Sequence, residues 1–361
     1  MTAQEISPTQ EAPVTPASTP EMSKQREGHM ARGIRFLKNL STIVLTLSKL
    51  IVSVFFLLLL VSFFGGGNSS DSPGSTVLFG EGPEKIAVVD LSGTIVDSAA
   101  TDPFATLSDP QLITPRKLLK QFEKIKEDDH IKAIVLRINS PGGSVTASDE
   151  IYYLIKRFRE QTGIPVIASY GEVAASGGYY ISLAADTIIA DPTSITGSIG
   201  VIASLINVKS LADQYGIREL TVTAGNNKNF MSPLQEPVAS QTAIIQTIVD
   251  EAYDQFIARI NESRTVPHST LTALADGRPL TGKQAHEAKL ADQLGNFYDA
   301  VEYARKQTGF TDAAVVEFAA GGFLESLLGV VIKPFSRLNP FASITTPLSL
   351  LQGKPAYLYS P

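Results

Sequence analysis

The sequence predicts an α/β domain with mostly parallel strands, preceded by one transmembrane helix. Two observations carry this prediction. Short β-branched stretches alternate with amphipathic stretches between residues 85 and 310, which is the rhythm of strands joined by helices. Upstream, residues 43–64 are almost wholly apolar, and a helix needs about 20 such residues to cross a bilayer.

Composition narrows the classes of function. The 361 residues are 43% hydrophobic, which is enough for a sizeable core, and carry a net charge of −6. No basic run occurs outside the N-terminal arm, which argues against nucleic acid as a partner. The absence of cysteine excludes structural disulfides, a thiol nucleophile and Cys-based metal sites.

The N-terminal part of the chain is expected to form an arm, an anchor and a linker. Residues 1–40 are expected to form a disordered cytoplasmic arm, because the first thirty are rich in Pro, Thr, Gln, Glu and Ser and cannot bury enough apolar surface. The predicted anchor spans residues 41–64. Five basic residues precede its core and none follows before Lys85, which places the N-terminus in the cytoplasm and the rest outside. A flexible linker is expected over residues 65–84.

A cleaved signal peptide and a buried core helix are the alternatives to an anchor. A signal peptide has an apolar region of about 7–15 residues and a small-residue cleavage site, and no clear A-x-A site follows this stretch. A core helix is disfavoured because the run GGGNSSDSPG follows at once, at residues 65–74.

The domain at residues 85–310 is expected to contain four clear strands and six helices. The strands are expected at residues 85–91, 133–138, 165–170 and 187–190. The helices are expected at residues 115–126, 148–161, 174–185, 241–264, 282–290 and 297–307. Residues 311–361 are expected to form a tail of Leu, Val and Phe with scattered Pro, which can cover the domain, contact the membrane or serve assembly.

Ser176 is the first candidate for chemistry. It stands in the run AASGG at residues 174–178, just after an expected strand and at the start of an expected helix. A serine at such a turn presents its hydroxyl away from the backbone, and the N–H of Gly177 can stabilise an oxyanion. The alternative is tight packing of a helix onto a sheet, which the run alone does not exclude.

A glycine-rich turn supplies a second piece. The run NSPGGS at residues 139–144 directly follows an apolar strand, and Gly143 can direct an N–H into a cleft as a second oxyanion donor. An ordinary Pro-Gly turn, with Ser144 capping the next helix, is the alternative. The two interpretations are compatible.

A serine nucleophile needs a proton acceptor. None of the four histidines, His29, His130, His268 and His286, has an obvious partner, which disfavours a Ser-His-Asp triad. Lys228 is the only charged residue between positions 219 and 236, and burial would favour the uncharged amine that a base requires.

Lys228 and a third hydroxyl each have a simpler alternative. Lys228 can instead be a loop lysine that points into water. Ser198, in the run TGSIG at residues 196–200, can orient the lysine amine or can be a plain turn serine.

Together these motifs resemble the signal peptide peptidase A family of membrane-anchored Ser/Lys peptidases, which have a Clp/crotonase-like fold. The resemblance covers roughly residues 80–310 and includes AASGGYYI at 174–181, MSP at 231–233 and DGR at 276–278. It implies Ser176 as nucleophile, Lys228 as general base, Ser198 as the lysine-orienting residue, and Gly143 and Gly177 as the oxyanion hole. It implies no metal and no organic cofactor.

The resemblance also implies substrates, partners and location. Cleaved signal peptides and other hydrophobic or unfolded peptides are the expected substrates, and the lipid bilayer is an expected partner. Short family members assemble into rings in which neighbouring subunits contribute Ser and Lys, so a homo-oligomeric ring is expected. The catalytic domain would then lie outside the cytoplasm, on the inner or cell membrane of a prokaryote.

Two other functions fit the same fold. A crotonase-type acyl-CoA enzyme would use residues 276–295 equally well, but such an enzyme has no use for an outward-facing anchor, and its acidic catalytic residues are not evident. A non-catalytic membrane scaffold would need none of the motif residues for chemistry.

Overall fold

The computed structural model describes residues 42, 45–50, 52–54, 56, 75–97, 112–318 and 356–358. The chain divides into two compact units, Met1–Ser70 and Asp71–Pro361. In the first unit the described residues are helical, and apolar side chains such as Leu50 and Phe56 are exposed. Among all the described residues, no helix is both long and apolar enough to cross a bilayer. Most of the predicted anchor and all of the predicted arm at 1–40 lie outside the described residues.

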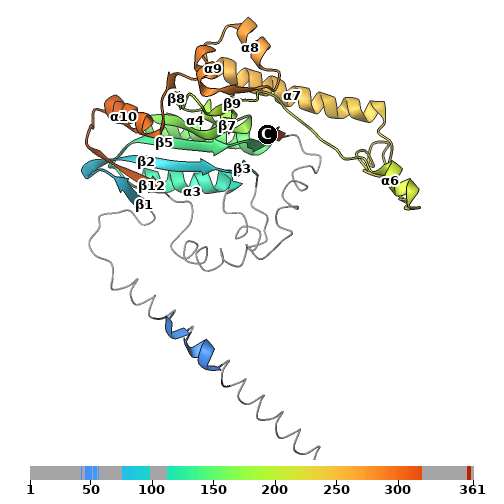
Figure 1. Cartoon of the computed structure of the whole chain (residues 1–361), viewed down its shortest axis with the longest axis horizontal. Coiled ribbons are helices and arrows are strands. Elements are labelled where there is room, and N and C mark those ends of the chain that lie inside the picture. Colours follow the sequence, from blue (N-terminus) through green and yellow to red (C-terminus); the bar gives the residue numbers. More distant parts are fainter. Residues whose placement is uncertain are drawn as a thin grey trace, which may run out of the picture. The chain divides into compact units, whose positions relative to one another are not determined.

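The second unit is built on a sheet of nine described strands (Figure 1). Their order is β1-β12-β2-β5-β7-β8-β11, with β9 beside β7 and β10 beside β9. Neighbouring strands from β12 to β11 are parallel, whereas β1 is antiparallel to β12. The strands are β1 (Ser75–Phe79), β2 (Gly82–Ser92), β5 (Ile131–Ser140), β7 (Val166–Ala175), β8 (Thr187–Ala190), β9 (Ile195–Gly197), β10 (Pro279–Thr281), β11 (Gln293–Leu294) and β12 (Ala313–Phe318). The predicted α/β fold with mostly parallel strands is confirmed.

A second, smaller sheet has the order β13-β6-β3-β4. Its strands are β3 (Thr94–Ile95), β4 (Leu112–Ile113), β6 (Gly142–Ser144) and β13 (Ala356–Leu358). Strands β3 and β6 follow β2 and β5 almost directly along the chain, so this small sheet stands at the carboxyl ends of the large parallel strands.

Side chains of the large sheet alternate between two apolar cores, as the period of a strand requires. Ala87 and Val89 of β2 belong to the larger core, which α3, α4, α5 and α7 complete. Ile86 and Val88 face the other core, with buried residues of α10. The helices are α3 (Pro115–Lys126), α4 (Val145–Thr162), α5 (Gly177–Ser182), α6 (Lys209–Gln214), α7 (Ala239–Ser263), α8 (His268–Leu274), α9 (Gly282–Glu287) and α10 (Phe297–Thr308). Burial on both faces explains why the parallel strands are so apolar.

Side-chain caps set the ends of several helices. The Thr114 side chain accepts a hydrogen bond from the backbone of Lys117 at the start of α3, and Asn296 begins α10 with a capping box. Such caps satisfy N–H groups that the first helical turn leaves unpaired. Gly163, with φ 68°, ends α4 in a left-handed conformation that glycine adopts without strain.

The boundaries differ from the predicted ones in two places. Strands β1 and β12 lie outside residues 85–310 but pair with each other, and β12 pairs with β2, so they extend the sheet. The helix predicted at residues 174–185 is shorter, because β7 continues to Ala175 through pairing with β9. The strand therefore ends immediately before Ser176.

Candidate active site

Ser176 is the single residue between strand β7 and helix α5. Its backbone has φ 53° and ψ −115°, which is a rare conformation for a residue with a side chain. Two backbone hydrogen bonds hold it there: Ser176 donates to the carbonyl of Gly197 (2.8 Å), and Tyr180 donates to the carbonyl of Ser176 (2.8 Å). A sharp strand-to-helix turn of this kind directs a serine hydroxyl away from the surrounding backbone.

The Ser176 hydroxyl is buried and unpaired. The residue is 1% exposed, and its Oγ has no hydrogen-bond partner among the described residues. An unpaired buried polar group typically costs about 1–3 kcal/mol, and folded proteins leave few of them. Strain and an unused hydroxyl at one residue together indicate a reactive position.

Glycines of two elements meet beside this serine. A Cβ atom on Gly177 would lie 3.0 Å from Cα of Gly142 and 3.2 Å from the nitrogen of Gly143. Gly143 itself has φ 154°, and a Cβ there would lie 2.0 Å from the carbonyl oxygen of Ile95, so only glycine fits. The structure thus brings the two predicted oxyanion positions together beside Ser176.

The turn before α4 has two functions at once. The Ser144 side chain accepts a hydrogen bond from the backbone of Ala147 (3.4 Å) and so caps α4. The same turn places Gly143 against Gly177. The sequence analysis gave two compatible interpretations of this turn, a helix cap at Ser144 and a position for Gly143 beside Ser176. The structure has both.

Ser198 also lies next to Ser176. Gly197 accepts the backbone hydrogen bond of Ser176, and Ser198 follows it with φ 50° and an exposed fraction of 7%. Its backbone N–H donates to the carbonyl of Arg278 (2.9 Å). Ser198 is therefore a buried residue that directly follows β9, the strand that pairs with the end of β7.

Lys228 is not brought to this group within one chain. It is exposed, and its backbone N–H donates to Gly225 of its own turn (3.1 Å). No hydrogen bond joins it to Ser176, Ser198 or the two glycines in the part of the chain that the structure describes. This is the one predicted site residue that stands apart from the others.

The described histidines also stand apart from Ser176. His130 is exposed beside Glu84, His268 begins α8, and His286 contacts the carbonyl of Ala291. His29 lies outside the described residues. Among the described residues no cluster of His, Cys, Asp and Glu could hold a metal ion.

A polar cluster around Tyr180 was missed by the sequence analysis. The buried Tyr180 hydroxyl donates to Asp149 (2.6 Å) and accepts from Gln255 (3.0 Å), while Arg259 forms an ion pair with Asp149 (3.2 Å). Burial, followed by the bond to Asp149, raises the pKa of Tyr180, so the hydroxyl stays protonated and donates. This cluster ties α4 and α7 to α5. One signal in the sequence could have indicated this cluster. Tyr180 follows Ser176, the N-cap of α5, by four residues, which is about one helical turn.

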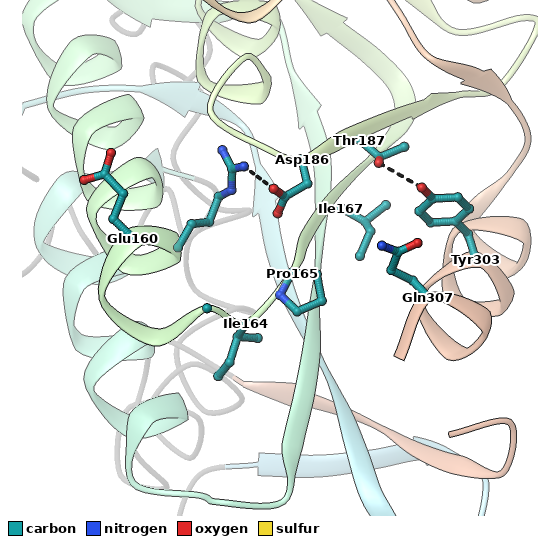
Figure 2. Close-up of a pocket in the computed structure, with 10 residues that line it drawn as sticks. Glu160, Ile164, Pro165, Ile167, Asp186, Thr187, Tyr303 and Gln307 are labelled. Atoms are coloured by element: carbon teal, nitrogen blue, oxygen red, sulfur yellow. Dashed lines mark hydrogen bonds and ion pairs between the residues drawn. The ribbon is translucent and has the colours of Figure 1, made fainter. Parts of the chain in front are cut away.

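A separate cavity of about 320 Å³ lies at the opposite end of β7, between α4 and α10 (Figure 2). An Arg159–Asp186 ion pair and a hydrogen bond from Thr187 to the Tyr303 hydroxyl (3.2 Å) border it. Strand β7 starts beside this cavity at Val166 and ends at Ala175, a length of about 30 Å at about 3.3 Å per residue. The cavity therefore does not belong to the site at Ser176.

Comparisons with known proteins identify relatives of this chain. The family model of peptidase family S49 matches residues 158–311, and that of Clp protease matches residues 113–202. A putative signal peptide peptidase SppA of Enterococcus faecium is 35% identical over 262 residues, which cover 72% of this chain and 75% of that protein. Protease 4 of Haemophilus influenzae is 34% identical over 252 residues, 69% of this chain and 39% of that protein.

A solved structure also resembles this one. A mutant of the 1510-N membrane-bound stomatin-specific protease aligns with a TM-score of 0.39 and 18% identity, covering 66% of this chain and 99% of that chain. At that score the likeness adds nothing to the relationship that the sequences establish. The sequence relatives favour the peptidase over the acyl-CoA enzyme and the scaffold. The chain belongs to peptidase family S49, the family of signal peptide peptidase A, and is a serine-type peptidase.

Proposed function

We propose that this chain is a membrane-anchored signal peptide peptidase that works through a Ser176–Lys228 dyad. The observation that carries the proposal is the Ser176 hydroxyl, which is buried, held in a strained turn and unpaired among the described residues. It lies beside the paired glycines Gly143 and Gly177. These features are what a nucleophile with an adjacent oxyanion hole requires.

The proposed reaction assigns a step to each of these residues. The uncharged amine of Lys228 takes the proton of the Ser176 hydroxyl, and Oγ attacks the scissile carbonyl carbon. The N–H groups of Gly143 and Gly177 stabilise the oxyanion, and Ser198 orients the amine. Lys228 then protonates the leaving amine, and water, activated by the same amine, hydrolyses the acyl-enzyme.

The lysine is proposed to come from a second copy of the chain. Lys228 lies in a segment, residues 202–248, that exposes many apolar side chains: Ile202, Leu205, Ile206, Leu211, Tyr215, Ile217, Leu220, Val222, Val238, Ile244 and Ile248. Leu220 is 94% exposed, and a patch of this kind marks an interaction surface. In α7 only Phe256 and Ile260 are buried.

A neighbouring copy of the chain would supply what the exposed segment and the Ser176 hydroxyl each lack. The segment at residues 202–248 needs apolar cover, and the Ser176 hydroxyl needs a base. Placing this segment over the site of the next copy is a head-to-tail contact, and repeated head-to-tail contacts close into a ring. Burial in that contact would disfavour the charged ammonium, as a general base requires.

Membrane anchoring and substrate class form the second part of the proposal. The apolar stretch at residues 41–64, with basic residues before it, supports an anchor whose catalytic domain faces away from the cytoplasm. Apolar peptides left in the bilayer after signal-peptide cleavage would then be within reach. A relative named as a putative signal peptide peptidase supports this substrate class.

Labelling and turnover test the dyad. The full chain in detergent should react with a fluorophosphonate probe and hydrolyse an apolar signal-like peptide, whereas Ser176→Ala should remain unlabelled and lose at least about 10⁴-fold in turnover. Lys228→Ala should lose comparable turnover, while Lys209→Ala, which removes a half-buried lysine of the same segment that pairs with Asp213, should keep it. Unlabelled wild type, or full turnover by Lys228→Ala, would contradict the dyad.

Mixing and protease protection test the assembly and the topology. If Ser and Lys come from different copies, inactive Ser176→Ala and Lys228→Ala proteins should regain turnover when they are dissociated together and reassembled. Failure to regain any would place both residues in one chain. On sealed inner-membrane vesicles whose cytoplasmic face is outside, the catalytic domain should lie in the lumen and resist added protease. Digestion from the cytoplasmic side would overturn the proposed topology.

A further inference from the structure

One edge of the large sheet exposes apolar and aromatic side chains. Strand β1 forms this edge and pairs with β12 alone among the described strands (Figure 1). Val77 and Leu78 of β1 are exposed, and the ring of Phe79 lies 5.8 Å from that of Tyr298 in α10. Tyr298 is exposed too, and the half-buried Phe297 lies 5.7 Å from it, between ring centroids. These five residues form the β1–α10 face, and exposed apolar residues that lie side by side mark a surface of contact.

Basic side chains lie over two of these rings. The guanidinium group of Arg305 is 5.9 Å from the ring centroid of Phe79, and that of Arg137 is 5.3 Å from the ring centroid of Phe297. Arg305 is engaged in an ion pair with Glu302 (2.7 Å). Arg137, by contrast, is exposed and forms no ion pair with any residue that the structure describes. Its N–H groups are therefore available to an anionic oxygen outside the chain.

A phospholipid surface suits this combination of groups. Tyr has an apolar ring with a polar hydroxyl, and Arg has an apolar stem with a charged end, so both gather where hydrocarbon meets headgroups. A wholly apolar protein partner would bury Arg137 without a counter-charge, whereas lipid phosphates accept its N–H groups. Charge and apolar surface together favour lipid over a second protein.

The course of the chain gives an independent reason. The predicted anchor ends at residue 64 and β1 begins at Ser75, so only residues 65–74 separate the two. Ten residues span at most about 35 Å when fully extended. Strand β1 is thus the first element after the anchor, and it cannot lie further than this from the bilayer.

We propose that the β1–α10 face lies on the phospholipid surface, at the level of the headgroups, and holds the domain in one orientation on the bilayer. This inference rests on the proposed anchor, which brings the face to the membrane. The depth follows from the open edge of β1, because water and headgroups satisfy the N–H and C=O groups of an unpaired edge, whereas hydrocarbon does not. Arg137 then contacts phosphates, and Val77 and Leu78 reach the outermost part of the acyl chains.

Fluorescence quenching tests the contact. The chain has no cysteine, so a single introduced cysteine reports on one place. Leu78→Cys and Tyr298→Cys put a nitrobenzoxadiazole label on the β1–α10 face of the full chain, and Leu119→Cys puts it on α3, which covers the opposite face of the sheet. In vesicles of phosphatidylethanolamine and phosphatidylglycerol, nitroxides on the headgroups should quench the labels at positions 78 and 298 at least several-fold more strongly than the label at 119.

The same measurement identifies other occupants. Equal quenching at the three positions, or stronger quenching at 119, would overturn the proposal. Labels at 78 and 298 that are shielded from aqueous iodide but escape the lipid nitroxides would show that a protein covers the face, which also overturns it. Nitroxides at the ends of the acyl chains should quench weakly, and stronger quenching by them than by headgroup nitroxides would contradict the proposed depth.

Substitutions test the residues themselves. Leu78→Gln combined with Arg137→Gln should reduce headgroup quenching of the label at position 298 at least several-fold. Leu119→Gln combined with Arg157→Gln makes the same chemical changes on the opposite face, where both residues line the groove between α3 and α4, and should leave that quenching unchanged. Equal quenching in the two double variants would show that Leu78 and Arg137 do not hold the face on the lipid.

Two further readouts separate this inference from the proposed function. Extraction with alkaline carbonate tests the anchor, and fluorophosphonate labelling tests the nucleophile. A chain that resists carbonate and labels at Ser176, but shows no selective quenching at 78 and 298, keeps the proposed function and refutes the lipid contact. Selective quenching in a chain that carbonate removes, or that does not label, keeps the lipid contact and refutes the anchor or the peptidase.

Discussion

The backbone nitrogen of Gly143 lies 3.2 Å from the position that a Cβ atom on Gly177 would occupy. Residues 34 positions apart in the chain are thus in contact because β6 and α5 both leave adjacent strands, β5 and β7, at the same edge of the sheet. A side chain at position 177 would therefore meet the backbone of the turn at Gly142 and Gly143. This contact makes the size of residue 177 a direct test of the site.

We expect Gly177→Ala to destabilise the domain by about 1–3 kcal/mol, as over-packing typically does. The new methyl group would lie 2.7 Å from Oγ of Ser148 and 3.0 Å from Cα of Gly142. Urea unfolding measures the stability, and fluorophosphonate labelling, expected to be lost, measures the site. Ser148→Ala is the matched partner in a double-mutant cycle, because it removes the nearest contact.

The cycle separates stability from activity. The double variant should recover part of the lost stability, because Oγ of Ser148 is gone, but should remain unlabelled, because the methyl group still crowds Gly142 and Gly143. Full labelling of Gly177→Ala would show that position 177 does not border the reacting atoms.

The Tyr180 hydroxyl supplies the second prediction. Tyr180→Phe keeps the ring but leaves Asp149 and Gln255 without their shared partner. We expect a loss of about 1–3 kcal/mol in the free energy of unfolding. Tyr298→Phe is the control: this tyrosine is 66% exposed, so its change should stay within about 0.5 kcal/mol.

Fluorophosphonate labelling extends this test to Ser176. Tyr180 N–H holds the carbonyl of Ser176, and α7 holds the Tyr180 hydroxyl through Gln255. Loosening the cluster should therefore slow labelling of Ser176 as well as lower stability. Unchanged stability in urea would show that the cluster does not tie α7 to α5.

Local patterns in the sequence accounted for most of the fold. The continuous apolar run of β2, the N-cap of α3 and the glycine turn before α4 are all decided within a few positions. The position of Ser176 at a strand-to-helix turn followed from the same local signals. Two boundaries were missed because pairing between distant strands, β7 with β9 and β1 with β12, extended elements beyond their local signal.

Long-range contacts of the site could not be predicted from residue patterns. The ion pair between Asp149 and Arg259 spans 110 positions, and neither residue stands in a distinctive motif. The pairing of β13 with β6 likewise joins the end of the chain to its middle, and three residues of Ala, Tyr and Leu carry no register signal. The proposed contact between Lys228 and a second chain depends on a surface rather than on a motif.

The pair of Asp276 and Arg278 provides a prediction about pH. Hydrogen bonds from the Arg278 side chain and backbone lower the pKa of Asp276 to about 2, below its ordinary value of about 3.9. A lowered pKa in the folded state means that the pair stabilises the fold above about pH 4 and stops doing so as the pH falls towards about 2. The carbonyl of Arg278 accepts from the backbone N–H of Ser198, so the pair lies beside the turn that carries Ser198.

An NMR titration of the Asp276 carboxyl checks this value. Arg278→Gln should return the pKa of Asp276 towards about 3.9. Because both side chains are exposed, 1 M salt should reduce the shift in the wild type. A pKa that neither Arg278→Gln nor salt changes would assign the shift to another cause.

The exposed segment at residues 202–248 gives the last prediction. Leu220 and Val222 are 94% and 92% exposed, so replacing them by Gln and Thr removes no contact within the described chain that would stabilise a single copy. If a neighbouring copy covers them, each loses burial worth about 1.5–3 kcal/mol, and association should weaken at least about tenfold. Analytical ultracentrifugation in detergent should show the double variant as smaller species, while the midpoint of thermal unfolding measured on single copies stays the same.

Labelling of Ser176 should fall with the assembly, because Lys228 would no longer reach it. Leu119→Gln, an exposed apolar residue of α3, is the matched control and should leave both assembly and labelling intact. A double variant that assembles and labels like wild type would show that this segment faces solvent in the working protein, and that the base for Ser176 must be sought within one chain.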